Sequence, residues 1–341
     1  MPKIYVFCGA GGVGKTTLSA GFAIALGHAG HRVAIITIDP ARRLAEAFGL
    51  SSGALGNDPI PLPNYPNVEA MTLHPTAVFD AFVSEHSTAA QAESLFQNRY
   101  YRYTSQKMSG IHEYMAMLRL IQLVDTAQYD AIVLDTPPAK NALDFLYAPE
   151  RIQGLMGKRT LSWLKPRSSW SALQLGIDIA QKAINGIIGS QTLSDLFDFF
   201  EIFARVGEAL SQEAIKIDQL LKSDQSQFYL VCSPQLRAVY EAAELKDKLN
   251  AAHYQWSHLL LNRIPQRLPP LEAEYQKSPF YSQLWNIHEQ GCKNAIEAEQ
   301  LLQSCSLQDV PMFRLSEIAS SDTDDILSQI ALDLRSLVKD L

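Results

Sequence analysis

A glycine-rich segment near the amino terminus has the residue types and spacing of a phosphate-binding loop. It reads Gly9-Ala10-Gly11-Gly12-Val13-Gly14-Lys15-Thr16 and fits the pattern G-x-x-x-x-G-K-[ST]. Glycines allow positive φ angles and a close approach of the backbone, so successive amides can point at phosphate oxygens. A helix that begins at the end of the loop adds its partial positive charge. We therefore expect residues 11–17 to bind the phosphates of a nucleoside triphosphate.

Three side chains at the end of this loop have separate expected roles. Lys15 should reach the β and γ phosphates, and the Thr16 hydroxyl should bind Mg²⁺. Thr17, through its amide or its hydroxyl, is expected at the α phosphate. Together they predict a triphosphate site that carries a magnesium ion.

Two aspartates each close a predicted strand and so project toward the same edge as the loop. Asp135, in AIVLDTPP, is the expected Walker B carboxylate, which holds Mg²⁺ directly or through a water. Asp39, in IITIDPARR, is the candidate that orients or deprotonates the attacking water. Either carboxylate could instead cap a helix or a turn. Their places at strand ends favour the catalytic interpretation.

These side chains need a sheet to position them, and the apolar pattern predicts one. Short apolar runs that end at polar residues, glycine or proline indicate strands at residues 4–8, 33–38, 131–134, 227–232 and 258–261. An alanine-rich helix is expected over residues 16–30. A strand, a helix and a second strand within about 35 residues form a right-handed βαβ unit. The fold class is therefore a doubly wound, mostly parallel α/β sheet.

Other segments lie outside this sheet. Residues 51–68 are proline-rich and predict an irregular surface loop. Residues 75–125 and 150–225 have a helical pattern, which we interpret as insertions within a single domain of residues 1–341. Within residues 193–210 one helical stripe is apolar: Leu193, Leu196, Phe197, Phe200, Phe203 and Leu210. Further apolar residues lie off the stripe, so this helix is either buried among others or part of a groove for an apolar client.

Composition excludes several classes of protein. The formal net charge is −7, with 36 acidic and 29 basic side chains, which disfavours nucleic acid as the main partner. We expect no integral membrane segment and no secretory signal, hence a cytoplasmic location. No CxxC pair occurs, so neither a disulfide framework nor a zinc site is expected, and the compartment should be reducing. The four cysteines are Cys8, Cys232, Cys292 and Cys305.

Taken in order, the motifs resemble those of the ArsA family of ATPases, which includes the arsenite-pump ATPase and the ATPase that targets tail-anchored membrane proteins. GGVGKTT is similar to the family's phosphate loop, DPARRLAEAFGL to its first switch and DTPPAKNALDFLYAP to its second. LLLNRI and VPMFRLSEIA resemble the two segments that hold adenine, through Asn262 and the turn at Pro311 and Met312. The resemblance covers most of the chain.

The resemblance implies an activity and an assembly. Members bind ATP with Mg²⁺ near the two-fold axis of a homodimer and change shape on hydrolysis, with Asp39 in the water-activating role. The helical insertions would then form the subdomain that binds an apolar protein client or an effector. Two alternatives stay open: a subunit of a metalloid (arsenite) efflux pump, and a slow switch of the MinD type.

The chain departs from the family pattern at two places. The family loop has a lysine that reaches the partner's phosphates, where this chain has Ala10. Arg42, Arg43 and Lys140 stand in the switch segments, and our hypothesis is that Arg42 or Lys140 supplies the missing cation. The family's CxxC zinc motif and its three arsenite-binding thiolates have no counterpart. We therefore expect no zinc and no response to arsenite.

Overall fold

The computed structural model describes residues 1–38, 43–51, 53–98, 101, 111–136, 190–270, 272, 275, 277–305, 307 and 310–339, without the side chains of residues 111–113, 190–205 and 339. The chain forms two compact units. The first comprises Met1–Leu73, Gln122–Leu143 and Leu220–Leu341, and the second His74–Ile121 and Asp144–Gln219.

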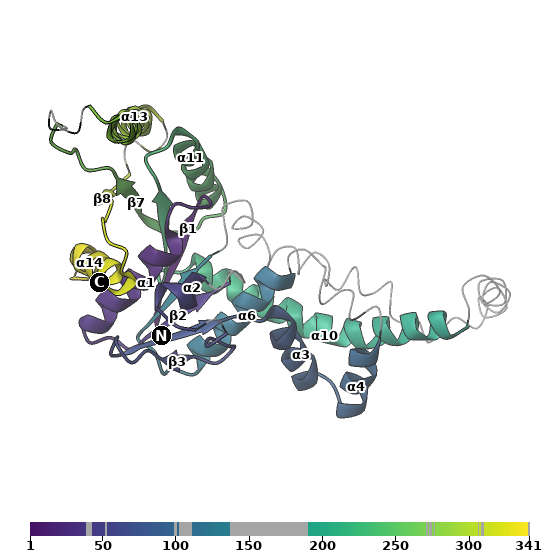
Figure 1. The fold of residues 1–341 in the computed structure, drawn as a ribbon. Helices are drawn as coiled ribbons and strands as arrows, with labels where there is room; N and C mark the ends of the chain where they lie inside the picture. The colour runs from purple at the N-terminus through teal and green to yellow at the C-terminus, as the bar shows by residue number, and fades with distance from the viewer. Residues whose placement is uncertain are drawn as a thin grey trace. The chain divides into compact units, whose positions relative to one another are not determined.

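The first unit is built on an eight-stranded sheet of the order β3-β4-β2-β5-β1-β6-β7-β8 (Figure 1). Neighbouring strands are parallel except for β3 and β4, which are antiparallel. This confirms the predicted mostly parallel α/β sheet. The strands are β1 (Lys3–Gly9), β2 (Val33–Thr37), β3 (Ile60–Pro61), β4 (Val68–Thr72), β5 (Ala131–Asp135), β6 (Ser226–Cys232), β7 (Trp256–Ile264) and β8 (Met312–Ser316).

Five of these strands coincide with the predicted apolar runs, and β3, β4 and β8 were not predicted. The short strand β4 follows the proline-rich segment, and Arg314 interrupts the apolar pattern of β8. Residues 51–68 differ from the predicted irregular surface loop, because they contain β3 and the buried side chains of Leu55, Leu62 and Tyr65. Edge strands carry polar residues on one side, which weakens the pattern that identifies them.

The strand order places the site. From β1 the chain moves to β2 and β4 on one side, returns to β5 beside β1, and then crosses to β6 on the other side. Ligands of open α/β sheets bind at such a point, beyond the carboxyl ends of the strands. The register puts Asp135 between Phe7 of β1 and Thr37 of β2. The carboxylate therefore lies at the edge from which the glycine loop leaves β1.

Helices cover both faces of the sheet. In the first unit they are α1 (Lys15–His28), α2 (Arg43–Ala47), α11 (Leu236–Ala251), α13 (Pro279–Ser304), α14 (Thr323–Asp333) and α15 (Arg335–Lys339). Helix α1 is buried along most of its length and packs against α14 (Figure 1). A Cβ on Gly21 would lie 2.3 Å from Ile330 Cγ2, so the two helices approach closely there. Behind β1, Phe22 packs among the rings of Tyr5, Phe7 and Tyr229.

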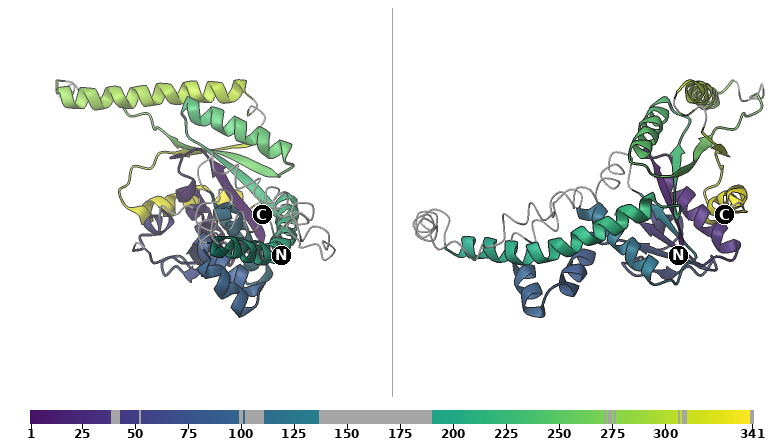
Figure 2. Two further views of the ribbon diagram at one scale, coloured as in Figure 1. Left: turned by 90° about the vertical axis from the view of Figure 1, so that its right-hand side faces the viewer. Right: turned by 180° about the vertical axis from the view of Figure 1, so that it is seen from behind.

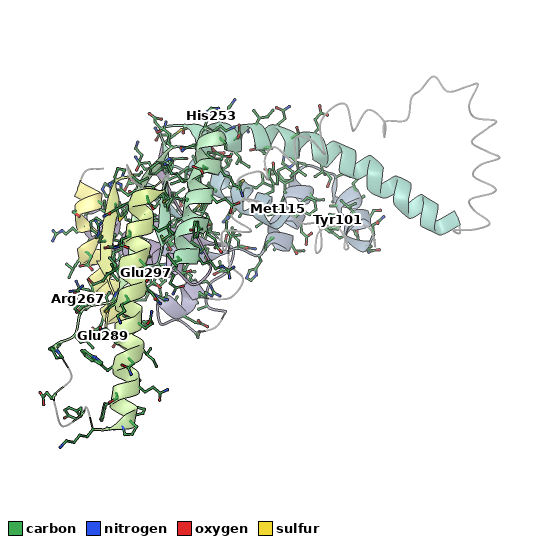
Figure 3. The ribbon with its side chains drawn as sticks, turned by 90° about the horizontal axis from the view of Figure 1, so that it is seen from above. Tyr101, Met115, His253, Arg267, Glu289 and Glu297 are labelled. Carbon is green, nitrogen blue, oxygen red and sulfur yellow. The ribbon has the colours of Figure 1, made fainter. Side chains whose placement is uncertain are left out.

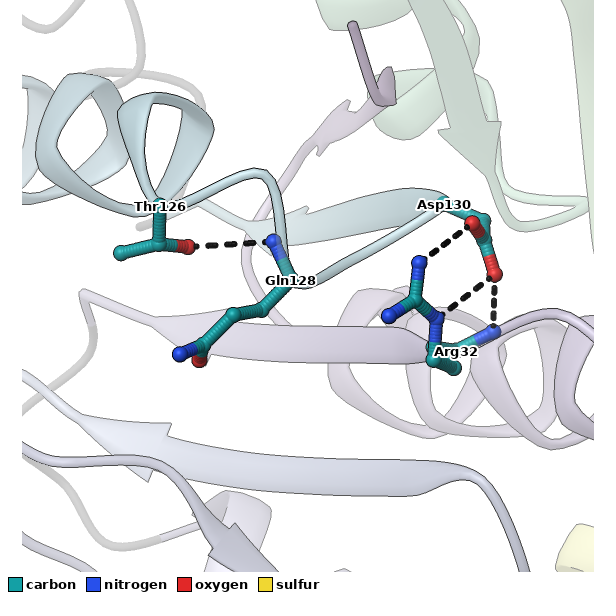
Figure 4. Close-up of polar contacts among 4 residues, drawn as sticks. All are labelled: Arg32, Thr126, Gln128 and Asp130. Atoms are coloured by element: carbon teal, nitrogen blue, oxygen red, sulfur yellow. Dashed lines mark hydrogen bonds and ion pairs between the residues drawn. The ribbon is translucent and has the colours of Figure 1, made fainter.

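An ion pair joins β2 and β5 at the sheet edge away from the glycine loop (Figure 4). The Arg32 backbone N–H and Nε donate to Asp130 Oδ2 at 2.8 and 3.3 Å, and Nη2 donates to Oδ1 at 3.1 Å. The hydrogen bonds from Arg32 lower the pKa of Asp130 to about 2. The pair fixes the residues that precede the two strands and so supports their register.

The second unit is helical in its described part, with α3 (Pro75–Glu85), α4 (Ala89–Gln97) and most of α6 (Ile111–Asp125) and α10 (Ser190–Lys222). The ring of Tyr101 stacks on that of Phe79 with 5.4 Å between centroids, and the Tyr101 hydroxyl donates to Asp80 Oδ1 at 2.6 Å. Figure 3 labels Tyr101 and the buried Met115. Most of the described residues between 75 and 125 lie in α3, α4 and α6.

The rest of the insertion prediction falls largely on other residues. Residues 150–189, and the side chains of Leu193 to Phe203, lie outside the described part of the chain. Farther along α10, Val206 and Leu210 are buried. Among the described helices, none combines the length and the apolar character needed to cross a membrane.

Candidate nucleotide-binding site

The glycine loop joins β1 to α1, in the strand, loop and helix context that the motif requires. Gly12 and Gly14 have φ angles of 81° and 92°, in the left-handed region that favours glycine. A Cβ on Gly14 would also lie 2.4 Å from Asn262 Nδ2. The backbone conformation therefore favours glycine at position 14, and a larger residue there would also displace the end of the Asn262 side chain.

Three side chains, one from α1 and two from β7, hold the carbonyl groups of this loop. Lys15 Nζ donates to the Ala10 carbonyl at 2.8 Å, and the lysine is buried. Asn262 Nδ2 donates to the Val13 carbonyl at 2.9 Å, and Arg263 Nη1 to the Gly12 carbonyl at 3.0 Å. The contacts from Asn262 and Arg263 turn two carbonyls toward β7, which leaves the N–H groups of those two peptides for an anion.

A carboxylate and two hydroxyl groups meet beside the end of the loop. The Thr16 hydroxyl donates to Asp135 Oδ2 at 2.8 Å, and the Thr37 hydroxyl donates to the same oxygen at 3.1 Å. Asp135 is fully buried. Hydroxyl and carboxylate oxygens are the ligands that Mg²⁺ prefers, so Thr16 and Asp135 fit the ion predicted for them. Thr37 was not predicted; its strand position, level with Asp135, is the signal for it.

A cavity of about 290 Å³ lies beside the loop and fits a base. Thr17 and Asn262 both line it. Asn262 is the residue predicted to hold adenine and Thr17 the one predicted at the α phosphate, and both assignments stay predictions. Its other wall comes from residues that follow β8, including Glu317 and Ile318, and from α14. Neither Pro311 nor Met312 is among its lining residues; the Pro311 carbonyl accepts from the Leu259 amide at 2.9 Å, within the sheet. The rule that ligands lie beyond strand ends would have selected residues 316–318.

Of the four residues predicted to supply a cation or to orient the water, the structure describes one. Asp39, Arg42 and Lys140 lie outside the described residues, whereas Arg43 begins α2. Ala10, at the position of the family lysine, is buried. The described residues contain no group of three or more metal-binding side chains, and Cys292 Sγ lies 3.6 Å from His288 Nε2. The absence of zinc stays a prediction.

Comparison with known proteins extends the argument to the whole chain. The family model described as anion-transporting ATPase matches residues 2–330. ATPase ASNA1 homolog 1 of Paramecium tetraurelia is 24% identical over 265 residues, which cover 75% of this chain and 73% of that protein. ATPase GET3 of Malassezia globosa is 24% identical over 287 residues, which cover 84% of this chain and 80% of that protein. ATPase get3 of Schizosaccharomyces pombe is 26% identical over 261 residues, which cover 75% of this chain and 71% of that protein. Because the family model spans nearly the whole sequence, the chain belongs to the ArsA family of ATPases.

Proposed function

We propose that this ATPase binds ATP together with Mg²⁺ and uses hydrolysis to switch its helical unit. The observation that carries the proposal is the 2.8 Å contact between the Thr16 hydroxyl and the buried Asp135 carboxylate, directly after the glycine loop. Motif, carboxylate and base-sized cavity lie in one unit, around the carboxyl ends of β1, β5 and β7. This is the arrangement that phosphoryl transfer to water needs.

Each part of the site has a separate task. The loop amides bind phosphate oxygens, while Lys15 exchanges its contact with the Ala10 carbonyl for one with the phosphates. Thr16 and Asp135 hold Mg²⁺, which neutralises charge on the phosphates when it is bound. Asn262 and residues 316–318 surround the adenine. Asp39 orients the attacking water.

Steady-state ATP hydrolysis tests this assignment. Lys15→Ala and Asp135→Asn are expected to lower kcat/KM by about a hundredfold or more, because electrostatic stabilisation of phosphoryl transfer is lost. Lys3→Ala is the matched control, since the Lys3 ammonium donates to the Asp224 carbonyl, away from the loop. Chelation of Mg²⁺ should abolish activity in the wild type. A Lys15→Ala variant as active as wild type would refute the proposal.

The catalytic cation has to come from another residue, because position 10 is alanine. We propose Arg42 or Lys140, both in switch segments, acting within one chain or across a dimer. Hydrolysis rates of Arg42→Ala and Lys140→Ala decide between them. If neither substitution slows hydrolysis, this assignment is wrong.

We also propose that the chain acts as a homodimer. The first half of α13 supports this, because Phe280 and Ile287 are 64% and 62% exposed and residues 279–294 carry only two charged side chains, Glu289 and Lys293. Figure 2 (left) shows α13 running past α11, and Figure 3 labels Glu289 and Glu297 along it. Charge is depleted at the centre of protein interfaces. Light scattering should find a dimer that Ile287→Asp dissociates and Gln290→Asp, on the same helix, does not.

The predicted helical insertions, residues 75–125 and 150–225, are proposed to bind an apolar protein segment in a manner set by the nucleotide. Binding of an apolar helical peptide should differ between the ADP and ATP states. Hydrolysis stimulated by arsenite instead of peptide would favour the metalloid-pump alternative.

A further inference from the structure

Two consecutive residues at the end of β7 contact the outer side of the glycine loop. In a regular strand, consecutive side chains point to opposite faces of the sheet. Here Arg263 has a φ of 61°, and the pairing of β7 with β8 shifts register between Leu261 and Ile264. This irregular backbone lets Asn262 and Arg263 both reach the loop, where they donate to neighbouring carbonyls.

The two contacts determine where two amides point. A trans peptide is planar, so its carbonyl and its N–H point in opposite directions. The Gly12 carbonyl belongs to the same peptide as the Val13 N–H, and the Val13 carbonyl to the same peptide as the Gly14 N–H. A donor that holds each carbonyl on the outer side therefore directs the next N–H inward, toward the phosphates.

Arg263 makes the stronger of the two contacts in electrostatic terms. Its guanidinium is charged, and charge-assisted hydrogen bonds are about twice as strong as neutral ones. Within the described part of the chain, the Gly12 carbonyl is its one hydrogen-bond partner. A cation on the carbonyl also polarises the peptide, which strengthens its N–H as a donor.

We propose that Arg263 is a positioning residue for nucleotide phosphates, acting through the Gly12–Val13 peptide. The inference rests on the proposed function, because it needs a phosphate in the loop. It concerns a residue outside the motif whose side chain acts on the loop from behind.

The chain contains a matched control. Arg237 and Arg263 line the same cavity, of about 670 Å³, together with loop residues 10–13. The Arg237 guanidinium pairs with Glu241 at 2.9 Å. Alanine at either position removes one positive charge from this cavity, but only at position 263 does it remove a hydrogen bond to the loop.

Calorimetric titration of the full chain with ADP and, separately, with pyrophosphate tests the proposal. Arg263→Ala should weaken both by about tenfold, the value of one charge-assisted hydrogen bond. Arg237→Ala should change either affinity by less than about twofold, because exposed charges are screened. Arg263→Lys, which keeps a charged donor, should bind between wild type and Arg263→Ala. Because Arg263 is exposed, Arg263→Ala should stay folded without ligand, with only a small fall in melting temperature from the lost hydrogen bond.

Several results would overturn the inference. Equal weakening by Arg237→Ala and Arg263→Ala would mean a long-range charge effect. Weaker ADP binding with unchanged pyrophosphate binding would place Arg263 at the base, since it also lines the smaller cavity. Unchanged affinity for both ligands would show that the contact does not position the loop. Wild-type protein that binds neither ligand would refute the proposed function itself.

Discussion

The short distance between Gly14 and Asn262 allows a quantitative prediction about the free energy of unfolding of variants in the glycine loop. Alanine at position 14 meets two obstacles: the φ angle of 92°, and Asn262 Nδ2 at 2.4 Å from the new Cβ. Alanine at position 12 meets only the first, because Gly12 has a φ angle of 81° and its new Cβ would have no neighbouring atom within 4 Å. The two glycines therefore separate backbone strain from side-chain contact.

The expected magnitudes follow from these geometries. A left-handed alanine costs about 1–2 kcal/mol, which applies to Gly12→Ala and Gly14→Ala alike. Alanine also reduces the conformational entropy of the unfolded chain, which raises the free energy of unfolding by a similar amount at both positions. This contribution cancels when the two variants are compared. Gly14→Ala also displaces Asn262 from the Val13 carbonyl, which costs about 1 kcal/mol more. In an Asn262→Ala background that hydrogen bond is already absent, so Gly14→Ala should cost about 1 kcal/mol less than in wild type.

Urea unfolding of the nucleotide-free protein measures this coupling in two double-mutant cycles. The cycle of Gly14→Ala with Asn262→Ala should give a coupling free energy of about 1 kcal/mol, whereas Gly12→Ala with Asn262→Ala should be additive within about 0.5 kcal/mol. Nucleotide must be absent, so that the free energy of unfolding reports the loop contacts alone. Equal coupling free energies in the two cycles would refute the role assigned to Asn262.

Three further outcomes are expected. Thr37→Val should lower the free energy of unfolding by about 1–3 kcal/mol and raise the Mg²⁺ concentration for half-maximal hydrolysis, because a buried donor to Asp135 is lost; Thr37→Ser should restore both. Since Arg32 lowers the pKa of Asp130 from 3.8 to about 2, the pair stabilises the fold fully above pH 3.8 and loses this effect as pH falls toward 2. The difference in melting temperature between wild type and Asp130→Asn should therefore shrink over that interval, and a constant difference would contradict the assignment. Burial raises the pKa of Cys8 to about 12, so mass spectrometry should find it alkylated in urea but not in the native protein at mildly alkaline pH.

Central strands were easier to predict than edge strands for a physical reason. β1, β2, β5 and β6 are covered on both faces and are continuous apolar runs. β8 lies at one edge of the sheet and carries the exposed Arg314, and β3 at the other edge has only two residues. β4 lies between β3 and β2 and is mostly buried, but Glu69 interrupts its short apolar run. Nothing local distinguishes a short strand of this kind from an irregular segment until its neighbour is known.

The sequence by itself determined the chemistry that is contiguous along the chain. The glycine loop with Lys15 and Thr16, and Asp135 at the end of an apolar strand, can be recognised because steric freedom, charge and strand direction are local properties. The order of the motifs determined the family.

Only the tertiary structure decided which other residues meet them. Thr37 reaches Asp135, Arg263 reaches Gly12, and residues 316–318 close the base-sized cavity, although these partners are distant in sequence. Their meeting depends on strand order, register and a shift at the end of β7, none of which is encoded by a local pattern. A shift of one residue in β2, for example, would turn the Thr37 side chain to the other face of the sheet.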